Sequence, residues 1–450
     1  MKKYSVLLVH CHDIGRHLGC YGINSVASEN IDAFAGEGVR FAQSFCTAPS
    51  CSPARASLFT GRYPHCTGVM GLCHNSFGWD LNSGERHLAG FLKKADYSTA
   101  AAGITHEISS DPKKWGYDFA DGKLFAEEVT NSAIQKLREF RGNKEKPFFM
   151  SVGFLEPHRL PAETTGGELG MIMMDHDFLG IHIQPDESLG LVIPGYLKDT
   201  PGTRRELAEL QGAIRHVDQQ FGRIMETLRV LGLEESTLVI FTSDHGIAMP
   251  RSKCTLYEPG VSVPLILRLP EREGWHGGKI IPHMVSTMDI TPSILSLTGL
   301  SIPHNIHGKS FTALLDGKSY KPRSCLFTEM TYHDYYDPRR AVRTERYKLI
   351  ANLSTAPFAM DPSQSWRPRS DVMGPNLKAA YHDYLELYDL RDDPYELRNL
   401  TYDSHYEAIQ KLLCDLLFNY MQETEDPILK GAVISPQHTA VVSMLQNCAD

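Results

Sequence analysis

Short runs of consecutive apolar residues recur along the chain, and longer stretches with helical spacing separate them. The runs lie at 6–9, in FFMSVGFL (148–155), in TLVIFTSD (237–244) and in PLILRL (264–269). Continuous apolar runs of this length are typical of strands that are buried on both faces of a sheet. We therefore predict four strands at these positions, the first of them close to the N-terminus.

The stretches between these runs have the spacing of amphipathic helices. Within 125–140, Val129, Ala133 and Leu137 recur every four residues, so that they share one helical face. A longer helix is predicted over 204–231, with Gly232 as its C-terminal stop. Strands that alternate with helices predict an α/β fold, in which helices cover both faces of a large, mainly parallel sheet.

The pattern changes near residue 325. AVRTERYKLI (341–350) alternates polar and apolar residues with period two, which predicts one strand, and LELYDL (385–390) predicts a second. A last helix is predicted over 404–421. We therefore divide the chain into a large domain of residues 1–324 and a smaller α+β domain of residues 325–450. The smaller domain is expected to hold an antiparallel sheet and one packed helix.

Composition argues against several classes of protein. The 450 residues carry a formal net charge of −9, so that nucleic acid is not expected as a partner, and no membrane partner is expected either. No apolar run is long enough to span a bilayer, and MKKYSVLLVHCHD (1–13) reads as a strand rather than a signal peptide. The ten cysteines show no paired CxxC spacing, which predicts no zinc site or disulfide framework and favours a reducing, cytoplasmic location.

Acidic residues stand at the ends of two predicted strands. Asp13 follows the first strand, and Asp244 and His245 follow the third. Ligands of open α/β sheets bind beyond the carboxyl ends of the strands, so that both carboxylates are expected at one edge. Two carboxylates repel each other there unless a proton or cation separates them, and a hard divalent cation is the natural partner. The alternative is that each aspartate caps the helix that follows it.

A second candidate site lies in CSPARASLFTGR (51–62), which predicts a short helix closed by Gly61. Pro53 suits the first turn, which puts Cys51 at the helix N-terminus, where free backbone N–H groups attract anions. Arg55 lies one turn further on. These residues are consistent with a nucleophile held over an anion site. The alternative is a structural buried thiol beside a surface arginine.

The longer segment CSPARASLFTGRYPHCTGV (51–69) resembles the signature of the type I sulfatase family, which depends on formylglycine and belongs to the alkaline phosphatase superfamily. The resemblance continues in family order through GCYG (19–22), EPH (156–158), TSDHG (242–246), KCTLYEPGVSVPLI (253–266), RAVRTERYKLI (340–350) and ELYDLRDDPYELRNL (386–400). IPGYLKDTP (193–201) and the run from TSDHGIAMP to LYEPG are most similar to the heparan N-sulfatase (sulfamidase) branch. The resemblance implies an alkaline-phosphatase-like fold and a catalytic domain at 1–324.

The resemblance also implies a mechanism. A formylglycine-generating or equivalent enzyme would convert Cys51 to an aldehyde, whose hydrate attacks sulfur with one hydroxyl and expels sulfate with the other. Arg55 would hold the hydrated aldehyde, and His106 would hydrogen-bond it and promote its collapse. By the same resemblance, Lys253 and His158 bind the sulfate group, and His245 lies near the metal and the sulfate oxygens.

The implied metal is one divalent cation held by Asp13, Asp244 and residue 51, with His245 close by and calcium as the family's usual ion. Two positions depart from the family. His12 stands where a second aspartate is usual, so that the metal could be manganese or zinc, or His12 could instead orient Asp13. Ile104 in GITH (103–106) stands where a lysine usually contacts the sulfate, and nothing in the sequence places Lys113 or Lys114 in the site.

These observations favour a sulfatase that hydrolyses a sulfate ester on a sugar or aryl group, with a small sulfated molecule or a sulfated glycan as substrate. One alternative is an N-sulfoglucosamine sulfohydrolase, and another is a phosphonate or phosphate ester hydrolase of the same superfamily. A non-catalytic protein that binds sulfated glycans would not need the nucleophile Cys51. A further interpretation, a metal-dependent phosphatase in which Cys51 is structural, is disfavoured by the family-wide resemblance. The segment 160–200 is expected to line the substrate entrance.

Overall fold

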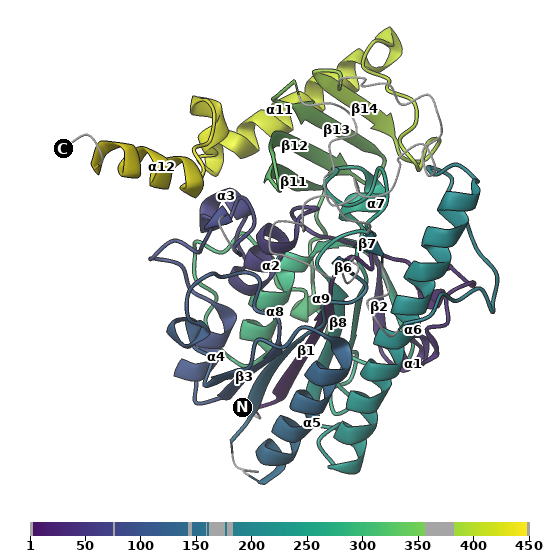
Figure 1. Cartoon of the computed structure of the whole chain (residues 1–450), viewed down its shortest axis with the longest axis vertical. Coiled ribbons are helices and arrows are strands. Elements are labelled where there is room, and N and C mark those ends of the chain that lie inside the picture. Colours follow the sequence, from purple (N-terminus) through teal and green to yellow (C-terminus); the bar gives the residue numbers. More distant parts are fainter. Residues whose placement is uncertain are drawn as a thin grey trace.

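The computed structural model describes residues 3–74, 77–142, 146–158, 160–161, 176–177, 183–355 and 382–447. An eight-stranded sheet lies at its centre, with the strand order β10-β2-β9-β8-β1-β5-β3-β4 (Figure 1). The strands are β1 (Ser5–Cys11), β2 (Val39–Phe45), β3 (Ser98–Gly103), β4 (Phe119–Ala120), β5 (Phe148–Gly153), β8 (Thr237–Ser243), β9 (Leu265–Arg268) and β10 (Lys279–Ser286). Only β9 runs antiparallel to its neighbours among these strands, so that the predicted mainly parallel sheet is confirmed.

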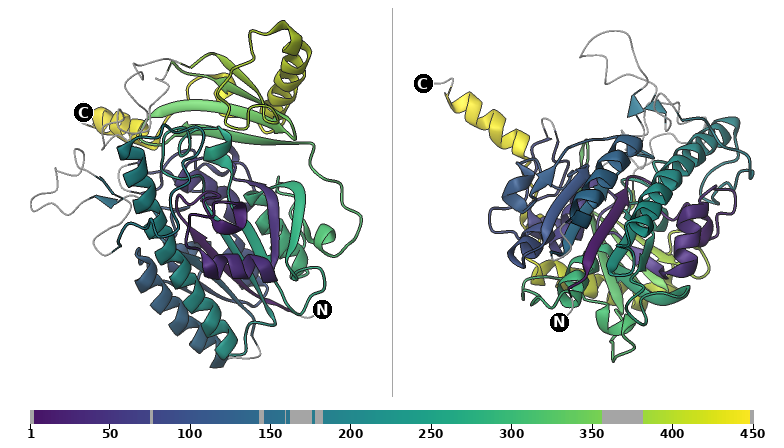
Figure 2. Two further views of the ribbon diagram at one scale, coloured as in Figure 1. Left: turned by 90° about the vertical axis from the view of Figure 1, so that its right-hand side faces the viewer. Right: turned by 90° about the horizontal axis from the view of Figure 1, so that it is seen from below.

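Successive residues of β1 point into two separate cores, one on each face of the sheet. Leu7 and Val9 pack beneath one set of helices, and Val6 and Leu8 pack beneath the other. The first set is α1 (Glu29–Glu37), α5 (Ala126–Gly142) and α6 (Pro201–Val230); the second is α2 (Cys51–Thr60), α4 (Leu88–Lys94) and α8 (Ile290–Leu297). Figure 2 shows the sheet between these layers. Burial on both faces explains why the strands read as continuous apolar runs.

The two predicted helices are present with slightly different limits. Helix α6 begins at Pro201 rather than at residue 204, because Thr200 caps it by accepting a hydrogen bond from Thr203 N at 3.1 Å. It ends at Val230, and Gly232 follows with a φ of 64°, in the left-handed conformation that terminates helices. The predicted stop at Gly232 is therefore confirmed.

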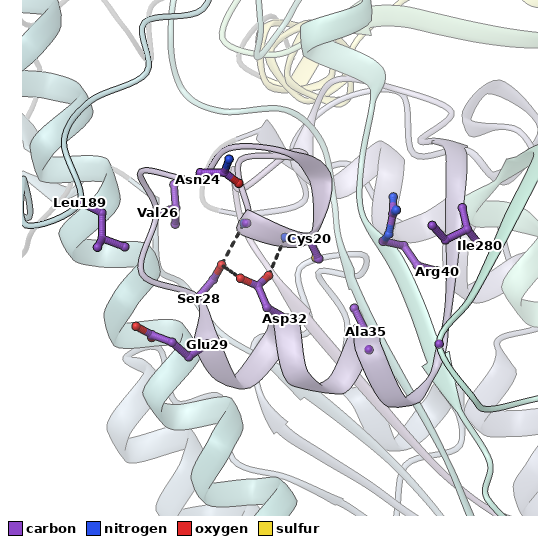
Figure 3. A pocket seen from close by; sticks show the side chains of 13 residues that line it. Cys20, Asn24, Val26, Ser28, Glu29, Asp32, Ala35, Arg40, Leu189 and Ile280 are labelled. Atoms are coloured by element: carbon purple, nitrogen blue, oxygen red, sulfur yellow. Dashed lines mark hydrogen bonds between the residues drawn. The ribbon is translucent and has the colours of Figure 1, made fainter.

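The GCYG motif forms a short turn after β1 that is tied to α1. Asp32 accepts hydrogen bonds from Cys20 N at 2.7 Å and from Ser28 Oγ at 3.0 Å (Figure 3). Arg40 lies beside this turn, with its guanidinium carbon 4.9 Å from the centroid of the Tyr21 ring. These contacts give the motif a structural role at the edge of the large sheet.

A second, antiparallel sheet follows, with the order β11-β12-β13-β14. Its strands are β11 (Cys325–Tyr332), β12 (Tyr336–Thr344), β13 (Tyr347–Asn352) and β14 (Leu385–Asp389). The prediction of a single strand over 341–350 is wrong, because a tight turn at residues 345–346 divides this segment between β12 and β13. Thr344 closes the turn: its Oγ1 accepts a hydrogen bond from Tyr347 N at 2.9 Å and donates one to Tyr347 O at 3.0 Å.

The last predicted helix corresponds to α11 (Glu407–Glu423), which packs against β12 and β13. The two sheets share an apolar cluster in which Phe45 and Tyr257 meet Met330 and Ile350. The smaller sheet begins at Cys325, and the division of the chain into domains at 324/325 stays a prediction. Beyond α11, α12 (Pro436–Asn447) projects from the body without a buried residue (Figure 1). None of the helices described is long and apolar enough to cross a membrane.

A buried ion pair connects the smaller sheet to the chain after α11. Arg340 is fully buried, and its Nε and Nη2 donate to Asp426 at 2.5 and 2.9 Å. We expect Arg340→Ala to lower the free energy of unfolding by about 3–5 kcal/mol, because it leaves the Asp426 carboxylate buried without its partner. Urea denaturation would measure this. Arg229→Ala removes an exposed pair with Glu226 and should barely change the unfolding midpoint; equal effects would contradict the prediction.

Candidate active site

The carboxyl ends of β1 and β8 lie side by side, since Cys11 pairs with Ser243 in the parallel ladder. Asp13 and Asp244 follow these two residues closely and therefore meet. Asp13 N donates to Asp244 Oδ1 at 3.0 Å. Asp13 has a φ of 47°, a left-handed conformation that is uncommon for a residue with a side chain and that clusters at functional sites.

His245 lies beside these carboxylates, and at the next residue the chain passes very close to another loop. A Cβ on Gly246 would lie 1.8 Å from Pro259 O, so that only glycine fits. His245 Nδ1 lies 3.0 Å from the Gly246 carbonyl, which can only accept, so that Nδ1 carries the proton. The lone pair on Nε2 can then accept a hydrogen bond from the Cys51 thiol, and Nε2 lies 3.4 Å from both Cys51 Sγ and Asp13 Oδ1.

Cys51 is the first residue of α2, directly after the N-cap Ser50, as the sequence predicted. Gly61 ends the helix with a φ of 72°. The alternative of a surface arginine is wrong, because Arg55 is only 1% exposed. Its Nη2 donates to Asp244 Oδ2 at 3.1 Å and to Cys11 O at 3.2 Å. The guanidinium therefore neutralises one of the two carboxylates from beneath the site.

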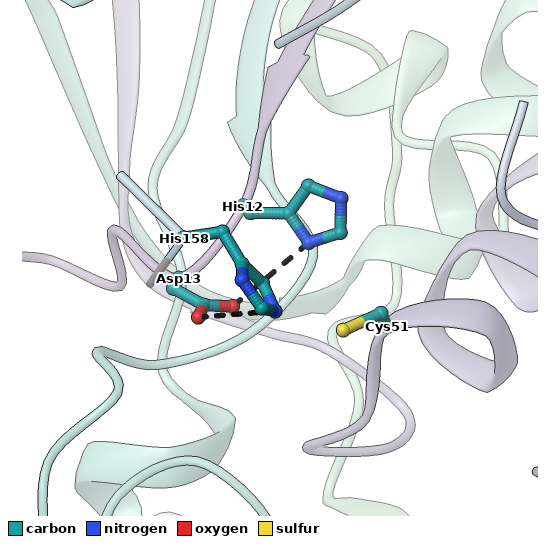
Figure 4. A group of neighbouring side chains, drawn as sticks. All are labelled: His12, Asp13, Cys51 and His158. Atoms are coloured by element: carbon teal, nitrogen blue, oxygen red, sulfur yellow. Dashed lines mark ion pairs between the residues drawn. The ribbon is translucent and has the colours of Figure 1, made fainter. Parts of the chain in front are cut away.

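Lys253 neutralises the other carboxylate. It is fully buried, and its Nζ donates to Asp13 Oδ2 at 2.8 Å and lies 3.0 Å from His158 Nε2. His158 follows the cis Glu156–Pro157 peptide bond, and Figure 4 shows its ring beside Asp13, with the Cys51 thiol nearby. A basic side chain and an imidazole thus converge beside the thiol, as binding an anion there requires.

Burial and neighbouring charges set the protonation states. Burial alone would raise the pKa of Asp13, but Lys253 and then His158 hold it below its usual value. Burial opposes ionisation of Asp244 too, yet His245, His12 and Arg55 keep its pKa well below the ordinary range. Burial raises the pKa of the Cys51 thiol. The unmodified cysteine is therefore a protonated thiol and a weak nucleophile.

Several buried atoms of the site lack a hydrogen bond to any described residue. They include Asp13 Oδ1 and His12 Nε2. His12 Nδ1 lies 3.0 Å from Asp244 Oδ2 but 3.9 Å from Asp13 Oδ1. His12 is therefore placed to orient Asp244, and not Asp13 as the sequence suggested. The pKa of His12 is lowered to about 4, first by burial and then by Arg55, which leaves a neutral imidazole that can bind a metal.

These atoms fit a divalent cation. One potential ligand group comprises Asp13, Cys51, Asp244 and His245, and a second comprises His12, Asp13, Cys51 and His158; within each group the ligand atoms lie within 4.8 Å of one another. Two carboxylates with unsatisfied oxygen capacity are the donors that a hard cation prefers. His12 adds a nitrogen donor, whereas the aspartate that is usual at this position would add an oxygen donor.

His106 borders this cluster on the open side. Its ring centroid lies 5.6 Å from that of His12, and its Nε2 lies 2.6 Å from His74 Nδ1. Burial, followed by His12 and His74, holds its pKa well below the usual value. His106 and Ile104 line a cavity of about 380 Å³, whose lining includes no lysine or arginine. Among the described residues, no lysine or arginine that lines this cavity replaces the cation missing at Ile104.

Other predicted positions lie elsewhere. Lys113 and Lys114 line a separate pocket and do not reach the site. Of the segment 160–200, expected at the substrate entrance, residues 162–175 and 178–182 lie outside the described residues.

Two histidines of the site were not predicted. His10 accepts a hydrogen bond from Arg55 Nη1 and lies 2.8 Å from Ser151 Oγ through Nε2. Its position two residues before His12 could have revealed it, because alternate residues of a strand share a face. His74 lies in a loop that carries no comparable signal.

A model of the sulfatase family matches residues 5–300, more than half of the chain. The chain belongs to the sulfatase family. A second model, described as the C-terminal region of N-sulphoglucosamine sulphohydrolase, matches residues 249–359. The type I sulfatase assignment and the likeness to the sulfamidase branch are therefore confirmed. Members of this family use a metal and a formylglycine, and this sulfatase has residue groups that can hold a cation.

Known proteins resemble this sulfatase along almost its whole length. Human (Homo sapiens) N-sulphoglucosamine sulphohydrolase is 29% identical, covering 94% of the chain and 91% of the human protein. A structure described as a complex with its substrate D-glucosamine-2-N,6-O-disulfate has a TM-score of 0.71 at 20% identity, covering 94% and 99%. A phosphonate monoester hydrolase of Agrobacterium radiobacter has a TM-score of 0.68 at 21% identity, covering 94% and 96%. These two structures establish the fold.

Proposed function

We propose that this sulfatase removes the sulfate group of N-sulfated glucosamine in a sulfated glycan, with formylglycine made from Cys51 as its nucleophile. The observation that carries the substrate is the similarity to human N-sulphoglucosamine sulphohydrolase over 94% of the chain, together with the match to that enzyme's C-terminal region. The structure in complex with a glucosamine disulfate agrees in fold. Hydrolysis of an O-sulfate on a sugar is the second candidate, since ulvan-active sulfatases of Formosa agariphila are also relatives.

The residues of the chain support distinct roles. Lys253 and His158 would bind the sulfate oxygens, because Nζ and Nε2 converge beside residue 51. One hydroxyl of the hydrated aldehyde attacks sulfur as the amine leaves with a proton, and the second hydroxyl then loses its proton as sulfate departs and the aldehyde re-forms. His106, neutral in the resting protein, would accept that proton. Water then restores the hydrate.

A bound divalent cation would supply positive charge for the sulfate oxygens and acidify the hydrate. Arg55 and Lys253 already balance the two carboxylates, so that a cation held by Asp13 and Asp244 leaves the pocket positive overall. Such a pocket attracts the negative sulfate group. Calcium is the ion implied by the family resemblance, and manganese or zinc would be favoured by the nitrogen of His12.

A substrate screen tests the proposal. N-sulfoglucosamine, glucosamine 6-O-sulfate, an aryl sulfate and an aryl phosphonate monoester would each be incubated with the purified protein, and released sulfate or phenol would be measured. The proposal expects the highest kcat/KM for N-sulfoglucosamine. Faster turnover of the 6-O-sulfate would identify an O-sulfatase, and turnover of the phosphonate alone would overturn the proposal.

The metal preference has its own test, the substitution His12→Asp. If His12 binds the metal, this variant should bind calcium more tightly and zinc or manganese more weakly than the parent, because a carboxylate oxygen replaces an imidazole nitrogen. Titration of the metal-free proteins with each ion, followed by calorimetry, would measure both affinities. An unchanged preference would mean that His12 only positions Asp244.

A further inference from the structure

A surface groove with a strong positive charge lies beside α4. The groove has a volume of about 550 Å³ and is bordered by the end of α4 and by the 3-10 turn η3 (Pro112–Trp115). Five basic side chains line it, together with the rings of Phe91 and Trp115; they are Arg86, Lys93, Lys94, Lys113 and Lys114. This concentration of positive charge contrasts with the net charge of −9 of the whole chain.

Most of this charge is available for a ligand. Lys94, Lys113 and Lys114 are exposed and form no ion pair with a described residue. Lys93 is the exception, because its Nζ lies 2.8 Å from Asp118 Oδ1. Three lysines without an ion pair to a described residue therefore form a local anion-attracting field in the groove.

The groove is connected to the active site through two short structural links. His87 lines the groove, and its Nε2 lies 3.3 Å from Glu107 Oε1. Glu107 directly follows His106, whose ring centroid lies 5.6 Å from that of His12. Glu107 and Ile108 are buried, and the chain reaches the surface at Ser109 before η3, where Trp115 Nε1 donates to Ser110 Oγ at 2.8 Å. An extended ligand that leaves the cavity at His106 can follow this segment to the lysines.

We propose that the groove binds the remainder of a sulfated polysaccharide chain while its terminal sugar occupies the active site. This inference rests on the proposed function, because the site then takes a sulfated sugar and the groove takes the next sulfates along the same chain. The groove would supply affinity and orientation for polymeric substrates only.

Binding to a fluorescein-labelled heparin octasaccharide tests the groove directly. The measurement uses Cys51→Ala protein at near-physiological salt, so that turnover cannot alter the probe. The groove variant carries Lys94→Glu, Lys113→Glu and Lys114→Glu. The control carries the same change of charge at exposed lysines elsewhere, namely Lys279→Glu, Lys411→Glu and Lys430→Glu. We expect the groove variant to lose at least about 10-fold in affinity and the control less than about 3-fold.

Kinetics with the nucleophile present complete the test. The groove variant should keep the parent's kcat/KM for N-sulfoglucosamine and have a raised KM for a heparan chain. Equal losses of heparin affinity in both variants would overturn the inference, and so would competition by duplex DNA as strong as by unlabelled heparin. The parent could release no sulfate from any sugar while the groove variant alone loses heparin binding. The proposed function would then be wrong, and binding of a sulfated polysaccharide by the groove would be confirmed.

Discussion

Replacing Cys51 with alanine should lower sulfate release by at least about 1,000-fold, because the variant lacks the group that we propose to attack sulfur. The fold should survive, since alanine removes only a thiol whose one hydrogen bond to the described residues is with His245 Nε2 at 3.4 Å. Circular dichroism and the thermal midpoint would establish this, and released sulfate would be measured by ion chromatography. Activity close to that of the parent would exclude residue 51 as the nucleophile.

Mass spectrometry separates this role from a general loss of activity. The peptide that contains residue 51 should be lighter by about 18 Da when formylglycine has formed, since the aldehyde oxygen replaces one sulfur and two hydrogen atoms. The specific activity of different preparations should rise in proportion to the modified fraction. Cys414→Ala, in a partly buried thiol on α11, is the matched control and should keep both the modification and the activity.

The substitution Asp244→Asn should remove the bound metal and lower kcat/KM by about 10²–10³-fold. The amide is nearly the same size, but it removes the negative charge that faces Arg55 at 3.1 Å and His12 at 3.0 Å. A cation would then meet one carboxylate and an uncompensated guanidinium. Elemental analysis of protein purified without chelators would measure the metal, alongside sulfate release with and without added calcium.

A buried aspartate outside the site provides the control for this change. Asp218 on α6 accepts hydrogen bonds from the backbone of Asn30 and Ile31, far from the nucleophile along the chain. Asp218→Asn keeps an acceptor at this position and should keep the metal content of the parent. If Asp244→Asn also keeps its metal and activity, Asp13 and Asp244 do not form a cation site.

The parts of the site that the sequence predicts are those attached to regular elements. Asp13 and Asp244 follow parallel strands, whose ends necessarily share an edge, and Cys51 begins a helix marked by Pro53 and Gly61. The positions of Lys253 and His158 came from family resemblance alone, because both lie on irregular loops. Arg251 and Cys254 flank Lys253 with φ values of 63° and 62°, and no local pattern predicts that path.

Other features depend on long-range pairing that a local pattern does not contain. The run at 264–269 is apolar whichever way its strand points, so that the antiparallel direction of β9 could not be predicted. Alternation with period two continues through residues 345–346, which hid the turn between β12 and β13. The basic groove joins residues 86–94 to residues 113–114, which are separated in sequence by β3. The cytoplasmic location stays a prediction.

The burial of α2 limits when the protein can be activated. All ten residues from Cys51 to Thr60 are buried in a helix, whereas a modifying enzyme has to hold a cysteine and its neighbours as an open segment in its own active site. The proposed oxidation therefore has to precede folding. At about 5–20 residues per second of synthesis, the roughly 190 residues from Cys51 to Asp244 take on the order of 10–40 s to appear. Until β8 emerges to pair with β1, the segment remains accessible. The active fraction is thus set by the rate of modification of Cys51 relative to the rate at which this segment folds. No later treatment of the folded protein can raise it.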